Sequence, residues 1–272
     1  IDFKRPDLVI KKILRSSISD LICKGDKPKY YFIAGSGNKK NFTKNNLKKI
    51  SNSLREEQKK YDLLLGGGDT TFSNKLSFTI TSIGYSKKII YRNQSNVNND
   101  IYVTGNLGDS FIGLQVLKNK IKLNKSKTKY FINKYYMPDI QNKFSKNLLS
   151  LATSSMDISD GLITDLNKLI NKQNFSYKIY EKLIPVSRNL NNLINSKNLK
   201  KIDLVSNGDD YQILFTAKPN NDRIINKLSK SLGVKISKIG TILSGKNKSL
   251  ILDQKGREIA INVDGYIHQF WS

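Results

Sequence analysis

Apolar residues recur every three or four positions between residues 7 and 23, which is the spacing of one face of an α-helix. Gly25 follows where a helix commonly ends. A second helix is expected after Thr43, whose hydroxyl can cap the N-terminus of a segment with a further apolar face. Short apolar or alternating runs around these helices predict strands at residues 30–34, 62–65, 76–80 and 89–92.

A polar, turn-rich segment at residues 93–99 separates this part of the chain from the rest, and we expect a domain boundary there. Beyond it, a strand at residues 101–104 precedes a helix that starts at Asp109. The remaining pattern predicts helices at residues 130–136, at 141–151 and from 157 onward, and strands near 177–180, 211–215, 234–239, 250–252 and 259–263. This mixture predicts an α/β protein of the α+β type with two domains, residues 1–92 and 93–272.

The chain is strongly basic, with 47 lysines and arginines against 22 aspartates and glutamates and a formal net charge of +25. Only 7 of the basic residues are arginine, the residue that carries most recognition of bases and phosphates in nucleic acids. The densest basic run, residues 118–129, contains no aromatic side chain on which a base could stack. We therefore expect no specific nucleic-acid partner, although the positive field would attract an anionic substrate.

Cysteine and histidine are each present once, as Cys23 and His268. An internal disulfide, a zinc site built from cysteines and a histidine-dependent nucleophile pair are therefore excluded or disfavoured. No stretch approaches the ~20 apolar residues of a membrane helix, so no membrane partner is expected. The cysteine usage fits a reducing, cytoplasmic setting. The chemistry must rest on oxygen ligands, the backbone and basic side chains.

A glycine-rich segment at residues 66–71, Gly-Gly-Gly-Asp-Thr-Thr, is expected to turn sharply after a strand. Glycines let backbone N–H groups approach phosphate oxygens, and Asp69 can hold Mg²⁺. A plain glycine turn between two strands explains the segment equally well. It is not a Walker A loop, because no Gly-Lys-Ser/Thr follows.

A second motif, Asp157-Ile158-Ser159-Asp160-Gly161, places two carboxylates and a hydroxyl within four residues ahead of a predicted helix. Ser159 or Asp160 could cap that helix, but capping needs one of them and not all three groups. In a chain this basic, such an acidic segment favours a site for a hard cation.

Several weaker signals accompany these motifs. Paired acids follow a glycine at residues 207–211, where an Asx-type turn is the simpler explanation. Asp20 lies near the apolar face of its helix, and an inward carboxylate needs a partner or a metal. Arg92 ends a predicted strand at the domain boundary, a place suited to a phosphate. The segment 105–110 could hold an anion at a helix start, although structural capping is the favoured interpretation.

Taken together, acidic turns, glycine-rich segments and one arginine indicate phosphoryl transfer from a nucleotide, with Mg²⁺ holding the phosphates. The motifs occur in a fixed order along the chain. They are 67–71 (Gly-Gly-Asp-Thr-Thr), 101–105 with 108–110, 156–162 (Met-Asp-Ile-Ser-Asp-Gly-Leu) and 208–211 (Gly-Asp-Asp-Tyr). This sequence resembles the bacterial thiamine-monophosphate kinases, of the aminoimidazole-ribonucleotide-synthetase-like superfamily, over essentially its whole length.

The resemblance implies an enzyme that transfers the γ-phosphoryl group of ATP to thiamine monophosphate and gives thiamine diphosphate. It also implies several Mg²⁺ ions and a homodimer formed through the N-terminal domains, which would also bind ATP and metal. By position, it implies Mg²⁺ ligands at Asp20, Asp69, Asp157 and Asp160, ATP contacts at Gly68, Asp69, Arg92 and Ser159, and a thiamine contact at Asp209.

The sequence departs from the family pattern in three places. Asp209 stands where the family usually has the longer Glu, and Val263 stands where an aromatic residue packs on the substrate. Acidic motifs that the family carries upstream are not in this sequence, which we interpret as lacking the family's N-terminal segment.

Two other functions therefore stay open. One is a sister ATP-dependent activity of the same superfamily, such as ring closure or selenophosphate synthesis. The other is a non-catalytic protein that binds nucleotides or polyanions.

Overall fold

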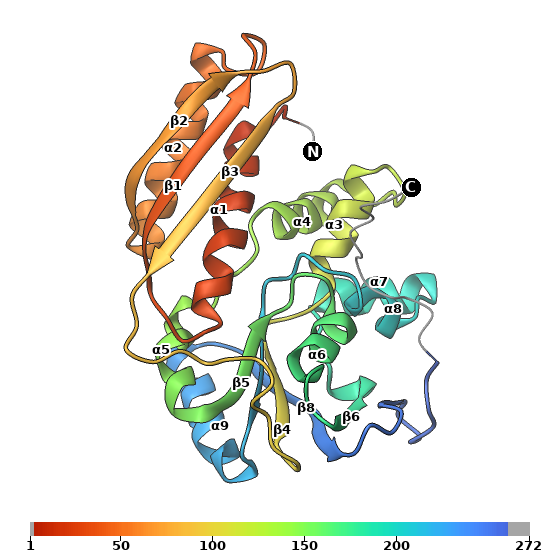
Figure 1. The fold of residues 1–272 in the computed structure, drawn as a ribbon. Coiled ribbons are helices and arrows are strands. Elements are labelled where there is room, and N and C mark those ends of the chain that lie inside the picture. Colours follow the sequence, from red (N-terminus) through yellow and green to blue (C-terminus); the bar gives the residue numbers. More distant parts are fainter. Residues whose placement is uncertain (1–2, 261–272) are drawn as a thin grey trace.

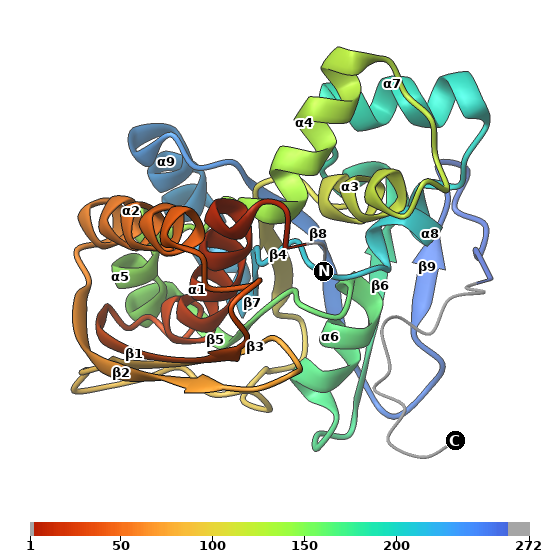
Figure 2. The same ribbon diagram turned by 90° about the horizontal axis from the view of Figure 1, so that it is seen from above.

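The computed structural model describes residues 3–260 and contains two mixed β-sheets with helices packed against them (Figure 1). The N-terminal part forms a three-stranded sheet in the order β2-β1-β3, in which β1 runs parallel to β2 and antiparallel to β3. Its elements are α1 (Pro6–Ile22), β1 (Pro28–Gly37), α2 (Lys44–Tyr61), β2 (Leu64–Phe72) and β3 (Ser77–Gly84). Helices α1 and α2 cover one face of this sheet, and the opposite face is left uncovered in both views (Figures 1 and 2).

Local sequence explains both N-terminal helices. Pro6 opens α1, where its missing N–H is not needed, and the predicted apolar face is buried except at Ile13 and Leu21, which are partly exposed. Thr43 caps α2 as predicted, because its Oγ1 accepts a hydrogen bond from the backbone N–H of Asn46 at 3.2 Å. Helix α2 ends where Asp62 adopts a left-handed conformation.

The C-terminal part is built on a six-stranded sheet in the order β5-β7-β4-β8-β6-β9. Its strands are β4 (Asp100–Thr104), β5 (Ala152–Asp157), β6 (Phe175–Tyr180), β7 (Ile213–Ala217), β8 (Ile236–Ser244) and β9 (Leu250–Leu252). Its α-helices are α3 (Asp109–Leu117), α4 (Lys125–Tyr136), α5 (Asn142–Leu151), α6 (Leu162–Ile170), α7 (Arg188–Lys197), α8 (Lys201–Val205) and α9 (Asp222–Leu232). The predicted class, α/β of the α+β type with two mixed sheets, is therefore confirmed.

Several predicted elements are wrong or were missed. Residues 89–92 form no strand, and strand β5 and helices α7, α8 and α9 were not predicted. The helix expected from residue 157 begins only at Leu162. Of the strand expected at residues 259–263, residues 259 and 260 are not in a strand, and the rest, including Val263, lies outside the described residues. None of the helices within residues 3–260 combines the length and apolar character needed to cross a bilayer.

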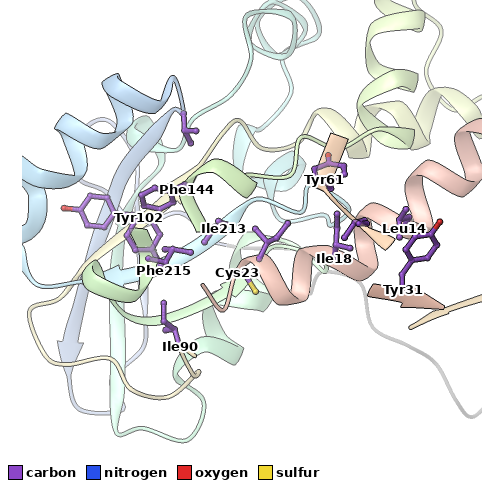
Figure 3. Packing of buried hydrophobic residues seen from close by; sticks show 14 of the residues in the cluster. Leu14, Ile18, Cys23, Tyr31, Tyr61, Ile90, Tyr102, Phe144, Ile213 and Phe215 are labelled. Atoms are coloured by element: carbon purple, nitrogen blue, oxygen red, sulfur yellow. The ribbon is translucent and has the colours of Figure 1, made fainter. Parts of the chain in front are cut away.

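The largest hydrophobic core is shared by the two sheets (Figure 3). On one side it contains Leu14 and Ile18 of α1 with Tyr31 of β1, and on the other Phe144 of α5 with Phe215 of β7. The opposite face of the six-stranded sheet has its own core. The leucine and isoleucine side chains of α6 pack into this core. Helix α1 thus belongs to both parts, and the division into domains at residue 92 stays a prediction.

Candidate active site

A cavity of about 1020 Å³ lies between α1, strand β3, helices α3 and α4, and the loops that follow β5 and precede β7. Five of the residues singled out from the sequence line it, namely Asp20, Asp157, Ser159, Asp160 and Asp209. Residues separated by almost 190 positions in the chain therefore meet at one place. Gly68, Asp69 and Arg92 are not among its lining residues.

Asp20 and Asp157 form an acidic pair at this cavity. Asp157 ends β5 and is 4% exposed, and its Oδ2 accepts a hydrogen bond from the Ser19 hydroxyl at 2.7 Å. Burial, with a further contribution from the negative charge of Asp20, raises the pKa of Asp157 to about 7. Asp20 is exposed at the cavity, so the expectation of an inward carboxylate is wrong, although desolvation still raises its pKa against the opposing charges of Lys24 and Arg92. A carboxylate whose proton affinity is raised by burial and by a neighbouring carboxylate favours a bound cation beside it.

The loop after β5 is held by a carboxylate that the sequence reading missed. Oδ2 of Asp165, a fully buried residue in the first turn of α6, accepts hydrogen bonds from three successive backbone N–H groups. They belong to Ser159 at 2.9 Å, Asp160 at 2.8 Å and Gly161 at 3.1 Å. Neither Ser159 nor Asp160 caps α6 with its side chain. The capping alternative is therefore wrong, and both side chains are left at the cavity, where Asp160 forms an ion pair with Lys168.

The loop before β7 is fixed against the loop after β5. The backbone N–H groups of Asp209 and Tyr211 donate to the carbonyls of Ser159 and Ile158, both at 2.8 Å. A Cβ atom on Gly208 would lie 1.8 Å from the Ser159 carbonyl oxygen, so only glycine fits there. These contacts set Asp209 beside Ser159 and Asp160 on the cavity wall.

Asp210 has a structural role. Its buried carboxylate accepts the backbone N–H of Gly108 at 2.8 Å and that of Ser110, and so caps the start of α3. Burial raises the pKa of Asp210 well above its ordinary value. The Asp210 carboxyl group thus occupies the N–H groups at the start of α3, which supports the structural interpretation of the 105–110 segment.

The glycine-rich segment lies elsewhere. Strand β2 continues through residues 66–71, so the expected sharp turn is wrong. A Cβ atom on Gly68 would lie 1.9 Å from the Ile33 carbonyl oxygen, which explains glycine at this point of close strand pairing. Asp69 is exposed, and its Oδ1 accepts the N–H of Thr70 at 2.7 Å. Arg92 is also exposed and reaches the cavity only through its charge effect on Asp20.

The carboxylates suit Mg²⁺, which prefers oxygen ligands and is usually held by one or two carboxylates together with substrate phosphates. Asp20 and Asp157 form such a pair. Within residues 3–260, no group of three or more histidine, cysteine, aspartate or glutamate side chains is arranged to hold a metal ion. The donor set therefore fits a metal completed by a phosphorylated ligand and does not form an all-protein cage.

Apolar and aromatic side chains form about half of the remaining lining of the cavity, and β3 and helices α3 and α4 are their main sources. These residues include Ile13, Phe78, Ile80, Phe111, Leu114 and Tyr135. A cavity that combines acidic side chains with aromatic and aliphatic ones suits a ligand that carries both phosphates and rings.

Comparison with known proteins places this fold in a defined class. Residues 1–86 match the family described as AIR synthase related protein, N-terminal domain. The thiamine monophosphate kinase structure from Aquifex aeolicus superposes with a TM-score of 0.82 at 22% identity and covers 94% of this chain and 82% of its own. The structure of AaThiL complexed with AMPPCP and TMP has a TM-score of 0.84 at 22% identity, with 97% and 81% covered.

Proteins related in sequence identify the family within this class. The thiamine-monophosphate kinase of Buchnera aphidicola subsp. Schizaphis graminum is 32% identical over 270 residues, which are 96% of this chain and 80% of that protein. The corresponding Escherichia coli K12 protein is 29% identical over 94% of this chain and 78% of its own length. The chain belongs to the thiamine-monophosphate kinase family, which confirms the resemblance inferred from its motifs. It spans about four-fifths of the length of these relatives.

Proposed function

We propose that this protein is a kinase that phosphorylates thiamine monophosphate with ATP to give thiamine diphosphate, by Mg²⁺-assisted in-line transfer. The observation that carries the proposal is the meeting of Asp20, Asp157, Ser159, Asp160 and Asp209 in one cavity. Fold alone would not support it, because one fold serves many activities. Membership of the family and the AaThiL complex with an ATP analogue and TMP add support.

The roles of the residues follow from their chemistry. Asp20 and Asp157 would hold one Mg²⁺ and Asp160 a further one, and these ions when bound would neutralise the phosphate charges and align the reacting groups. Ser159, on the loop fixed by Asp165, would donate its hydroxyl to an ATP phosphate. Asp209 would contact the thiamine moiety, and the apolar wall would exclude water from the reacting phosphates.

Asp69, Gly68 and Arg92 are proposed as ATP contacts, and Asp69 also as a metal ligand, from the family pattern. In the single chain they lie outside the cavity. We also propose that the protein is a cytoplasmic homodimer joined through the uncovered face of the β2-β1-β3 sheet. Large apolar side chains on the face opposite the buried Tyr31 support the dimer, because Phe32 and Leu64 are 41% and 48% exposed.

A turnover assay tests the function. Purified protein receives ATP, Mg²⁺ and thiamine monophosphate, and chromatography detects thiamine diphosphate, with thiamine and aminoimidazole precursors as alternative acceptors. Asp157→Asn should lower kcat at least about 100-fold, because it removes a charge that holds the metal. Asp203→Asn, on α8 and outside the cavity, is the matched control and should retain activity.

The outcomes separate the alternatives. Turnover of an aminoimidazole precursor in place of thiamine monophosphate would establish a sister activity. Nucleotide binding that ignores Mg²⁺, with no turnover of any acceptor, would establish a non-catalytic binding protein. Either result would contradict the proposed function.

A further inference from the structure

Lys12 occupies an unusual position behind the wall of the cavity. It lies on α1, is 5% exposed and does not line the cavity itself. Its Nζ is 2.7 Å from Oδ1 of Asp209 and lies over two aromatic rings, 4.4 Å from the centre of Tyr135 and 4.7 Å from that of Tyr211. All three of these partners line the cavity. One buried ammonium group therefore contacts two separate parts of the cavity wall, helix α4 and the loop before β7.

Stability does not explain this arrangement well. Burial lowers the pKa of Lys12, while the charges of Asp209 and Asp210 act in the opposite direction. A buried ion pair often contributes little net stability, because removing both charges from water cancels much of their attraction. Cation–π contacts with two rings offset part of that cost. A charged residue at this buried position therefore suggests a role other than stability.

The loop that Lys12 contacts has a strained backbone. Asp209 and Tyr211 have φ angles of 73° and 51°, in the left-handed region that non-glycine residues rarely adopt. Each such residue costs on the order of 1–3 kcal/mol and persists only when its surroundings enforce it. The Tyr211 hydroxyl also donates to Oδ1 of Asp209 at 3.2 Å. The Lys12 ammonium contacts both of these residues from α1, through its ion pair with Asp209 and its position over the ring of Tyr211.

We propose that Lys12 is a positioning residue that sets the specificity of the site for its acceptor substrate. It fixes Oδ1 of Asp209 and the ring of Tyr211, so that Oδ2 of Asp209 faces the ligand. The carboxylate is 30% exposed, which leaves it accessible from the cavity. This inference rests on the proposed function, in which the acceptor carries the positively charged thiazolium ring of thiamine. A fixed carboxylate beside aromatic rings suits such a cation.

The test replaces Lys12 with methionine, which has a similar length and no charge. Lys11→Met is the matched control, because Lys11 is the next residue on α1 and its partner Glu56 is exposed. We expect Lys12→Met to raise KM for thiamine monophosphate about tenfold or more and to leave KM for ATP within about twofold. Hydrogen exchange of the Asp209 and Tyr211 amides should accelerate in the same variant, because their loop is released.

A double-mutant cycle identifies the route of the effect. In an Asp209→Asn background, Lys12→Met should change KM for thiamine monophosphate by less than about twofold, because the carboxylate that Lys12 positions is already lost. A full additional effect in that background would overturn the inference. So would equal rises in both KM values together with a lower melting temperature, because that result indicates a merely structural lysine.

Two further arms keep the test decisive. If Lys12→Met does not fold, Lys12→Gln retains a hydrogen-bond donor and should give a smaller rise in the same KM; an unchanged KM overturns the inference. Calorimetry with thiamine monophosphate distinguishes a failure of the proposed function from a failure of the inference about Lys12. Wild-type protein that neither converts nor binds it refutes the proposed function. An active wild type whose Lys12 variants keep the wild-type KM refutes the inference alone.

Discussion

The ion pair between Arg15 of α1 and Glu57 of α2 allows a direct test of how buried charge joins the two N-terminal helices. Arg15 Nε and Nη2 lie 2.7 and 2.8 Å from the two carboxylate oxygens of Glu57, in a bidentate geometry. The side chains are 5% and 2% exposed. Nη1 of Arg15 also donates to the carbonyl of Pro138 at 3.0 Å, which ties the pair to the segment before α5.

Glu57→Gln removes the negative charge with little change in shape and leaves a buried guanidinium without its counter-charge. Removing one partner of a buried ion pair costs ~3–5 kcal/mol. The Pro138 carbonyl and the Tyr61 ring, whose centre lies 5.7 Å from the guanidinium, remain as partners. We therefore expect a loss of about 3 kcal/mol in the free energy of unfolding, which corresponds to a fall of roughly 6–12 °C in Tm for a protein of this size.

Glu56 provides the matched control one position earlier. It also pairs with a basic residue of α1, Lys11, at 2.5 Å, but its side chain is 64% exposed. Glu56→Gln should cost less than about 1 kcal/mol, as is typical of surface pairs. Urea denaturation followed by circular dichroism measures both variants, with the midpoint shifted and the m-value unchanged. Equal losses for the two variants, or a loss below about 1 kcal/mol for Glu57→Gln, would refute the reasoning.

Three further predictions concern other buried groups. Asp165→Ala should lower the free energy of unfolding, measured by urea denaturation, by about 3 kcal/mol or more and should reduce turnover, because three backbone N–H groups lose their acceptor. Asp165→Asn keeps an acceptor oxygen and should lower the free energy of unfolding by less. Burial raises the pKa of Asp157 to about 7, so in EDTA the folded protein binds this proton more tightly than the unfolded chain does. The resulting stabilisation of the fold is complete below about pH 4 and is lost as pH rises through 7. The Tm of wild-type protein should thus fall relative to that of Asp157→Asn between pH 4 and 8, and parallel curves would contradict this assignment. Burial raises the pKa of the Cys23 thiol, so a thiol reagent should label native protein slowly and unfolded protein fast; rapid labelling of native protein would show that α1 is not packed as described.

The elements predicted correctly from the sequence are those with a strong hydrophobic period. Helices α1 and α2 and strand β4 have clear apolar patterns, and packing follows those patterns. Strand β5 was missed because its sequence, Ala-Thr-Ser-Ser-Met-Asp, is mostly polar. Ser154 and Ser155 are nevertheless fully buried, and Ser154 Oγ accepts the backbone N–H of Gln94 at 2.8 Å. Tertiary hydrogen bonds of this kind leave no periodic signal in the sequence.

The candidate site likewise contains residues that the sequence indicates and residues that only the structure reveals. Acidic motifs at residues 157–160 and at Asp209 could be recognised because they are rare in a basic chain, and the structure brings them into one cavity. Asp165 and Lys12 could not be recognised from the sequence. Asp165 binds backbone N–H groups, which leave no mark in the sequence, and the partner of Lys12 lies far along the chain. Asp165 lies four residues after the motif that it holds, and that spacing on a helix is the one signal that could have revealed it. Lys12 is one lysine among many, and only its burial distinguishes it.

The core shared by the two sheets has a consequence for recombination between relatives. A chimera joined in the 93–99 segment would follow the boundary between the sheets, yet it would place a foreign α1 against the native Phe144 and Phe215. Side-chain volumes on the two sides of that contact must match, because densely packed cores tolerate neither gaps nor excess atoms. Crossovers that exchange α1 together with α5 and β7 should therefore yield folded hybrids more often than crossovers that exchange the N-terminal third as one block.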